Sequence, residues 1–168
     1  MTHPYVELAR HAVSATAEGR APVVTTLPPE LEQGRPVFVS LHGPGGRLRG
    51  CIGHTDVVER SMTREIVAMA VAAAREDPRF PPVRPEELAT LDVEVSVLGP
   101  HEPVRDLGEL DPRRYGVVVT DGRRRGVLLP DLPGVDTVEQ QLSIVRRKAG
   151  IPPETAIRID RFEVEVYR

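Results

Sequence analysis

The chain has little of several residue types, and each shortage excludes a class of protein. Cys51 is the only cysteine among 168 residues, so an internal disulfide is impossible and a reducing cytoplasm is the expected location. No apolar core of a signal peptide lies near the first residue. The longest apolar-rich run, 66–74, is far shorter than the roughly 18 residues that cross a bilayer. We therefore expect a soluble protein without a membrane partner.

Charges of the two signs nearly balance. There are 22 Lys and Arg residues against 25 Asp and Glu, a net charge of −3, which gives no strong field to attract nucleic acid. The basic turn at 122–126, GRRRG, has no interleaved aromatic residues and is typical of a solvated turn. Phosphate-binding loops, dinucleotide fingerprints and serine-nucleophile elbows are absent from the sequence, so no cofactor is predicted.

Apolar spacing predicts three helices and several strands. The helices are expected over 6–17, over the Ala-rich segment from an Asp56–Glu59 capping box to Glu76, and from an Asp136–Glu139 cap to Lys148. The strands are expected at 37–42, 47–53 and 91–98, on both sides of Asp121-Gly122 within 115–130, and at 162–167. Tight hairpins dominate over crossovers, which favours an α+β fold with a mostly antiparallel sheet and flanking helices. Residues 1–168 show no separable linker, so one domain is expected.

The stretch RLRGCIGHTD, 47–56, holds the single thiol. Arg49 and His54 flank Cys51 and are candidates to lower its pKa, which would make it nucleophilic. Gly50 and Gly53 leave the backbone free to approach a ligand. The alternative is structural, because a free cysteine is usually a small buried hydrophobe.

Other polar residues offer weaker candidates. Glu94 and Ser96 share the polar face of the 91–98 strand and could act as base and donor in a cleft, or simply face solvent. Asp77 and Arg79, in the DPRF segment, could hold a ligand or fix the loop.

Four residues offer soft metal ligands: His42, Cys51, His54 and His101. Their positions lack the spacing of known zinc motifs. No metal site is predicted.

The sequence resembles the AMMECR family, named from the Alport syndrome, midface hypoplasia and elliptocytosis critical region. The likeness is carried by LRGCIG at 48–53, DPRFPPV at 77–83, LDVEVSVL at 91–98, GVLLP at 126–130 and KAG at 148–150. It implies two unequal lobes with the hexapeptide beside a cleft between them. It also implies a bacterial or archaeal protein grouped with a Memo-like protein and a radical S-adenosylmethionine protein, the AmmeMemoRadiSam system. Memo-like proteins resemble extradiol dioxygenases, which suggests small-molecule chemistry.

One segment departs from the family pattern. Asp131 stands where relatives often have glutamine, and the helix that follows is less aromatic than theirs. A ligand contact shared through this segment is therefore not carried over.

Two hypotheses follow. In the first, the cleft binds or transforms a small polar metabolite. Its candidate catalytic residues are Cys51, His54 and Glu94, and its candidate ligand-binding residues are Arg49, Gly50, Gly53, Asp77 and Arg79. In the second, the protein is a non-catalytic scaffold for Memo-like and radical S-adenosylmethionine partners, and the hexapeptide is a structural corner. Catalysis and oligomeric state stay open at this point.

Overall fold

A computed structural model describes residues 2–168 and confirms the α+β fold class. The helices are α1 (Pro4–Ala17), α2 (Met62–Arg75) and α3 (Val138–Ala149), with short 3₁₀ turns at Pro29–Leu31, Pro44–Gly46, Pro85–Thr90 and Leu107–Glu109. The strands are β1 (Val37–His42), β2 (Leu48–Gly53), β3 (Asp92–Leu98), β4 (Glu102–Pro103), β5 (Gly116–Thr120), β6 (Arg125–Leu128), β7 (Arg158–Phe162) and β8 (Val164–Tyr167). Within the described residues, no helix is long and apolar enough to cross a membrane.

The chain divides into two compact units. The first contains the residues up to Val97 together with Glu165–Arg168, and the second contains Leu98–Val164. The sequence predicted one mostly antiparallel sheet. The structure has two four-stranded sheets instead, one in each unit.

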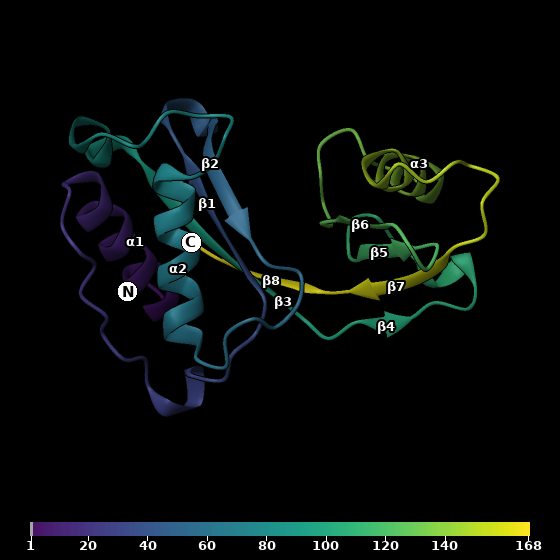
Figure 1. Cartoon of the computed structure of the whole chain (residues 1–168), viewed down its shortest axis with the longest axis horizontal. Helices are drawn as coiled ribbons and strands as arrows, with labels where there is room; N and C mark the ends of the chain where they lie inside the picture. The colour runs from purple at the N-terminus through teal and green to yellow at the C-terminus, as the bar shows by residue number, and fades with distance from the viewer. Residues whose placement is uncertain (1) are drawn as a thin grey trace. The chain divides into compact units, whose positions relative to one another are not determined.

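The sheet of the first unit has the strand order β2-β1-β3-β8 (Figure 1). Strand β1 pairs antiparallel with both β2 and β3, with Ser40 opposite Cys51 on one side and Glu94 on the other. Helices α1 and α2 lie side by side, and α2 packs on β1 and β2. The alternating residues Val37, Val39 and Leu41 are fully buried in the core beneath these helices. Each contributes about 1.5–3 kcal/mol relative to an exposed position.

The sheet of the second unit has the order β4-β7-β5-β6, and α3 packs on β6 and β5 (Figure 1). Its core gathers Val117, Val119, Leu128 and Val145. Thr137 and Gln140 form the capping box of α3, one residue later than the predicted Asp136–Glu139 cap, and Gly150 ends the helix at a φ of 70°. The tight turn expected at Asp121-Gly122 is a longer connection, because the strand pairing ends at Thr120 and Arg125.

Helix α2 begins later than the sequence predicts. The Asp56–Glu59 capping box is wrong: the N-cap is Ser61, whose hydroxyl accepts a hydrogen bond from the backbone N–H of Arg64. Ser61 is held there because it bridges to Gln33 and donates to Glu32. The segment between His54 and Ser61 is therefore a loop, and the positive end of the helix dipole lies at Ser61 rather than at Asp56.

Candidate functional site

Side-chain alternation gives the sheet of the first unit two different faces. A Cβ on Gly50 would lie 2.3 Å from the carbonyl oxygen of Ala73 in α2, so Gly50 faces the helices. Its neighbour Cys51 therefore faces the other way, together with Ser40 and Glu94 in the adjacent strands. We call the row Cys51, Ser40 and Glu94, with Arg168 paired to Glu94 at 2.9 Å, the polar row.

Cys51 is half-buried, and its thiol hydrogen-bonds to a neighbouring strand. The hydroxyl of Ser40 lies 3.1 Å from the sulfur and donates a hydrogen bond to it. Burial raises the pKa of the Cys51 thiol, while the Ser40 hydrogen bond and the charge of Arg79 oppose that rise. Neither Arg49 nor His54 is among the groups that lower this pKa, and their side chains contact Glu87 and Glu65 instead.

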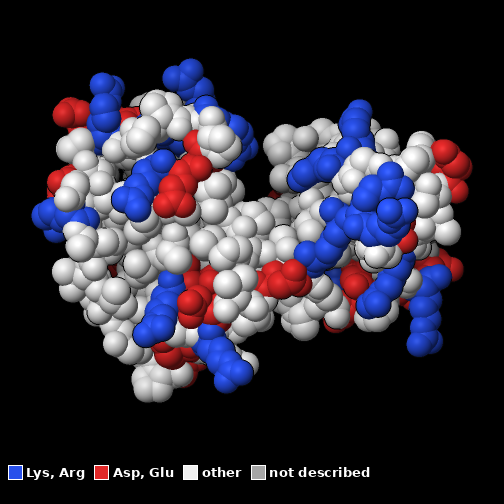
Figure 2. All heavy atoms as spheres, in the orientation of Figure 1, with Lys and Arg blue, Asp and Glu red and all other residues white. Residues whose placement is uncertain are grey.

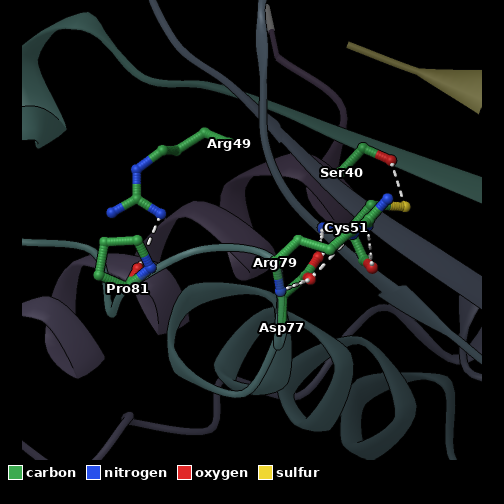
Figure 3. A network of polar contacts seen from close by, with 6 residues as sticks. All are labelled: Ser40, Arg49, Cys51, Asp77, Arg79 and Pro81. Atoms are coloured by element: carbon green, nitrogen blue, oxygen red, sulfur yellow. Dashed lines mark hydrogen bonds and ion pairs between the residues drawn. The ribbon is translucent and has the colours of Figure 1, made fainter.

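Asp77 and Arg79 cap the free edge of β2 at Cys51 (Figure 3). The backbone N–H of Cys51 donates to Asp77 Oδ2 at 3.0 Å, and Arg79 Nη2 donates to the carbonyl of Cys51 at 3.4 Å. Arg79 also donates to both oxygens of Asp77, from Nε at 3.0 Å and from Nη2 at 2.8 Å. Asp77 is only 3 % exposed, and the Arg79 guanidinium holds the pKa of that carboxyl well below its usual range.

This cap explains the position of the thiol. Because the N–H and C=O of Cys51 point outward to Asp77 and Arg79, they do not bond to β1. Cys51 and Ser40 are then a non-hydrogen-bonded antiparallel pair, in which side chains approach most closely. The edge that could pair with another strand is covered at this residue.

Arg49 reaches away from the thiol. Its Nε and Nη2 donate to the two oxygens of Glu87 at 2.7 and 3.0 Å. It also donates to the carbonyls of Pro82 and of Pro81, the second of which Figure 3 shows. The guanidinium carbons of Arg49 and Arg79 lie 6.0 and 5.5 Å from the ring centre of Phe80. Arg49 therefore ties β2 to the segment that follows α2.

Both hexapeptide glycines have close neighbours. Gly50 faces backbone of α2, and a Cβ on Gly53 would lie 2.3 Å from Phe38 and 2.5 Å from the carbonyl of Val37. Any larger residue would force the strand away from the helix or from its neighbour.

His54 contacts a buried carboxylate rather than the thiol. Its Nδ1 lies 2.6 Å from Oε1 of Glu65, in the first turn of α2. Since α2 packs on the face opposite Cys51, the structure does not bring these two catalytic candidates together.

Glu94 lies in the polar row and also lines a pocket of about 450 Å³. The other residues of this pocket are Arg10, His42, Gly46, Asp92, Val93 and Arg168, all in the first unit. The side chains of Arg10 and Asp92 have no hydrogen-bond or ion-pair partner within residues 2–168. The pocket therefore presents charge of both signs. Ser96, the predicted companion of Glu94, is buried.

The structure also places the metal-ligand and basic-turn candidates. Over residues 2–168, His, Cys, Asp and Glu side chains form no group of three that could hold a metal ion. In the basic turn, Arg124 pairs with Asp121 and donates to the carbonyl of Gly150. Basic and acidic side chains are intermixed over the face of the first unit that Figure 2 shows.

Comparison with known proteins identifies the family. A family model described as AMMECR1 matches residues 6–167. The chain belongs to the AMMECR1 family. This confirms the resemblance read from LRGCIG and the segments after it.

AMMECR1 relatives match over most of this chain. A protein of Thermotoga maritima is 48 % identical and covers 99 % of this chain and 98 % of its own length. The crystal structure of the uncharacterised protein PH0010 from Pyrococcus horikoshii has a TM-score of 0.85 at 34 % identity, covering 96 % of this chain and 88 % of that one. The protein CA_C1420 of Clostridium acetobutylicum is 42 % identical over 98 % of this chain, which spans only 36 % of that relative. In that organism the AMMECR1 domain is part of a longer polypeptide.

Several residues of the site were missed by sequence reasoning. Ser40, Glu65 and Glu87 contact Cys51, His54 and Arg49, yet each lies 11 or more positions away in the chain. Ser40 could have been found, because the predicted hairpin register places it opposite Cys51.

Proposed function

We propose that this AMMECR1 protein binds a small polar metabolite at the polar row and the pocket that Glu94 lines. The observation that carries the proposal is a pocket of about 450 Å³ with charges of both signs, two of them without partners among residues 2–168. This volume lies within the roughly 300–1,000 Å³ of small-molecule sites. A ligand with a carboxylate and an ammonium group, such as an amino acid, would complement Arg10 and Asp92.

Cys51 takes part as a neutral thiol in this proposal. Since burial raises the pKa of the thiol, attack on a ligand requires a base to remove its proton. Glu94, in the same row, is the proposed base, acting once a ligand displaces Arg168 from it. Gly50, Gly53, Arg49, Asp77 and Arg79, first predicted to bind ligand, are instead proposed to hold the strand that carries the thiol.

The second candidate function is a scaffold in the cytoplasm for Memo-like and radical S-adenosylmethionine proteins. It is favoured by the internal contacts of the hexapeptide, whose glycines face backbone and whose edge is capped by Asp77 and Arg79. The longer Clostridium relative also supports it, since there the domain is joined to additional protein.

A calorimetric binding panel separates the two functions. The panel contains neutral, acidic and basic amino acids and the matching monocarboxylates and amines. A zwitterion should bind to the protein, and its affinity should fall at least tenfold in Arg10→Ala and in Asp92→Asn. The control variants Glu86→Gln and Arg64→Ala each remove one charge, negative and positive respectively, at an exposed position outside the pocket. Both control proteins should bind the ligand with unchanged affinity. Equal affinity in all five proteins would refute the site, and co-purification with a Memo-like protein without ligand binding would favour the scaffold.

A further inference from the structure

The contact between His54 and Glu65 lies outside the polar row and serves neither proposed function. The Glu65 side chain is 1 % exposed. One of its oxygens, Oε1, lies 2.6 Å from His54 Nδ1. The other, Oε2, is buried without a hydrogen-bond partner among the described residues.

Stability alone does not account for this carboxylate. A buried carboxylate loses its hydration, and one ion pair or hydrogen bond recovers only part of that loss. Glu65 lies between Met62 and Ile66, both fully buried, in the first turn of α2. An apolar side chain there would avoid the cost, and an unpartnered oxygen is unusual in a protein interior.

The geometry assigns different roles to the two nitrogens of the imidazole. Nδ1 is engaged by Glu65, so Nε2 is the nitrogen left available. The His54 side chain is 38 % exposed, which leaves part of the ring accessible from outside. A carboxylate that accepts from Nδ1–H fixes the tautomer with a lone pair on Nε2 and stabilises the imidazolium that forms when Nε2 gains a proton.

We propose that His54 and Glu65 form a proton-transfer dyad, a second site in which His54 exchanges protons with a ligand hydroxyl or amine at Nε2 and Glu65 is the positioning residue. In the forward direction the ligand X–H bond breaks, its electron pair stays on X, and the proton bonds to Nε2. Nδ1 keeps its proton, so the dyad becomes an imidazolium beside a carboxylate. The return of the proton from Nε2 restores the starting state.

The dyad is tested with diethyl pyrocarbonate, which acylates neutral imidazole nitrogen. The protein is treated at pH 8 and labelling is measured for each histidine by peptide mass spectrometry. His11, which is exposed on α1, serves as the reference within the same molecule. Glu65→Gln keeps the size and one acceptor oxygen but removes the charge. We expect His54 to be labelled roughly tenfold more slowly in Glu65→Gln, with His11 unchanged. Equal His54 rates in the two proteins would reduce the contact to a structural tie.

Nitrogen NMR of the unmodified protein provides a second readout that needs no variant. The dyad predicts that neutral His54 carries its proton on Nδ1. A proton on Nε2 would mean that Glu65 donates to Nδ1, and it would overturn the proposal even if Glu65→Gln failed to fold. Neither readout depends on ligand binding at the polar row, so failure of the dyad and failure of the proposed function are distinguishable.

Discussion

Asp77→Asn offers the sharpest test of the cap on β2, because this buried carboxylate accepts every hydrogen bond in it except the one from Arg79 to the carbonyl of Cys51. Its Oδ1 accepts from the backbone N–H and Nε of Arg79, and its Oδ2 accepts from Nη2 of Arg79 and from the N–H of Cys51. Asparagine keeps one acceptor oxygen. Its amide group would face two donors, so two charge-assisted hydrogen bonds are lost.

The expected cost is about 3 kcal/mol. Hydrogen bonds to charged groups contribute about 1.5–3 kcal/mol each, so two give roughly 3–6 kcal/mol. The lower end applies because the Arg79 side chain is 55 % exposed and water can solvate it after the change. For a chain of this length, that corresponds to a drop in Tm of roughly 6–12 °C.

Urea unfolding at pH 7 measures this cost directly. Glu76→Gln is the matched control, since it removes the neighbouring charge from an exposed pair with Arg75 and should cost less than about 1 kcal/mol. Because the pKa of Asp77 is lower when folded than its ordinary 3.8, its contribution is present above pH 4 and is lost as pH falls below that value. The wild-type advantage should therefore shrink from pH 4 to pH 2. An Asp77→Asn protein as stable as Glu76→Gln at pH 7 would refute the cap.

Three further variants test other parts of the structure. Gly50→Ala should destabilise the first unit by more than about 2 kcal/mol in urea unfolding, because the new Cβ meets the carbonyl of Ala73. Gly43→Ala is the control: its Cβ would lie 3.9 Å from the carbonyl oxygen of Arg47, so it should change stability by less than about 0.5 kcal/mol. Thr137→Ala removes the N-cap of α3 and should cost about 1 kcal/mol, and an unchanged midpoint would contradict the capping box. Cys51→Ala should cost about 1 kcal/mol or less because the thiol is only half-buried, and it should still bind a ligand held by the pocket; a loss of several kcal/mol would favour the structural corner.

Local patterns predict much of the fold. The alternation at 91–98 predicts β3 nearly to the residue, and the turn at 43–46 between two β-branched runs predicts the β1–β2 hairpin equally well. Both signals depend only on neighbours in sequence. The start of α2 is different. Asp56 and Glu59 match a capping box locally, but Glu32 and Gln33 fix Ser61 as the cap from 29 and 28 positions away. The strand expected at 162–167 covers only the last residue of β7 and all of β8. These two strands join different sheets, which local alternation does not reveal.

The candidate site was predictable in its membership more than in its arrangement. Cys51, His54 and Glu94 were all candidates from residue type and context. His54, however, contacts Glu65 on the side of the sheet that α2 covers, whereas Cys51 faces the opposite side. Arg49, near the cysteine, and Asp77, in the DPRF segment, were candidates to bind a ligand. In the structure Arg49 pairs with Glu87, and Asp77 pairs with Arg79 and accepts from the backbone of Cys51. Burial also reversed the expected direction of the Cys51 pKa, and burial is a property of the folded chain.

In the proposed function, Cys51 is an accessible neutral thiol on a ligand-binding surface. The most direct test is the pH dependence of Cys51 alkylation by iodoacetamide in the folded protein, with the urea-unfolded protein as reference. Because Cys51 is the only cysteine, all thiol alkylation of the protein reports on this residue. We expect measurable labelling of the folded protein, with an apparent pKa above that of the unfolded chain. An apparent pKa below the unfolded value, or no labelling until the protein unfolds, would contradict it.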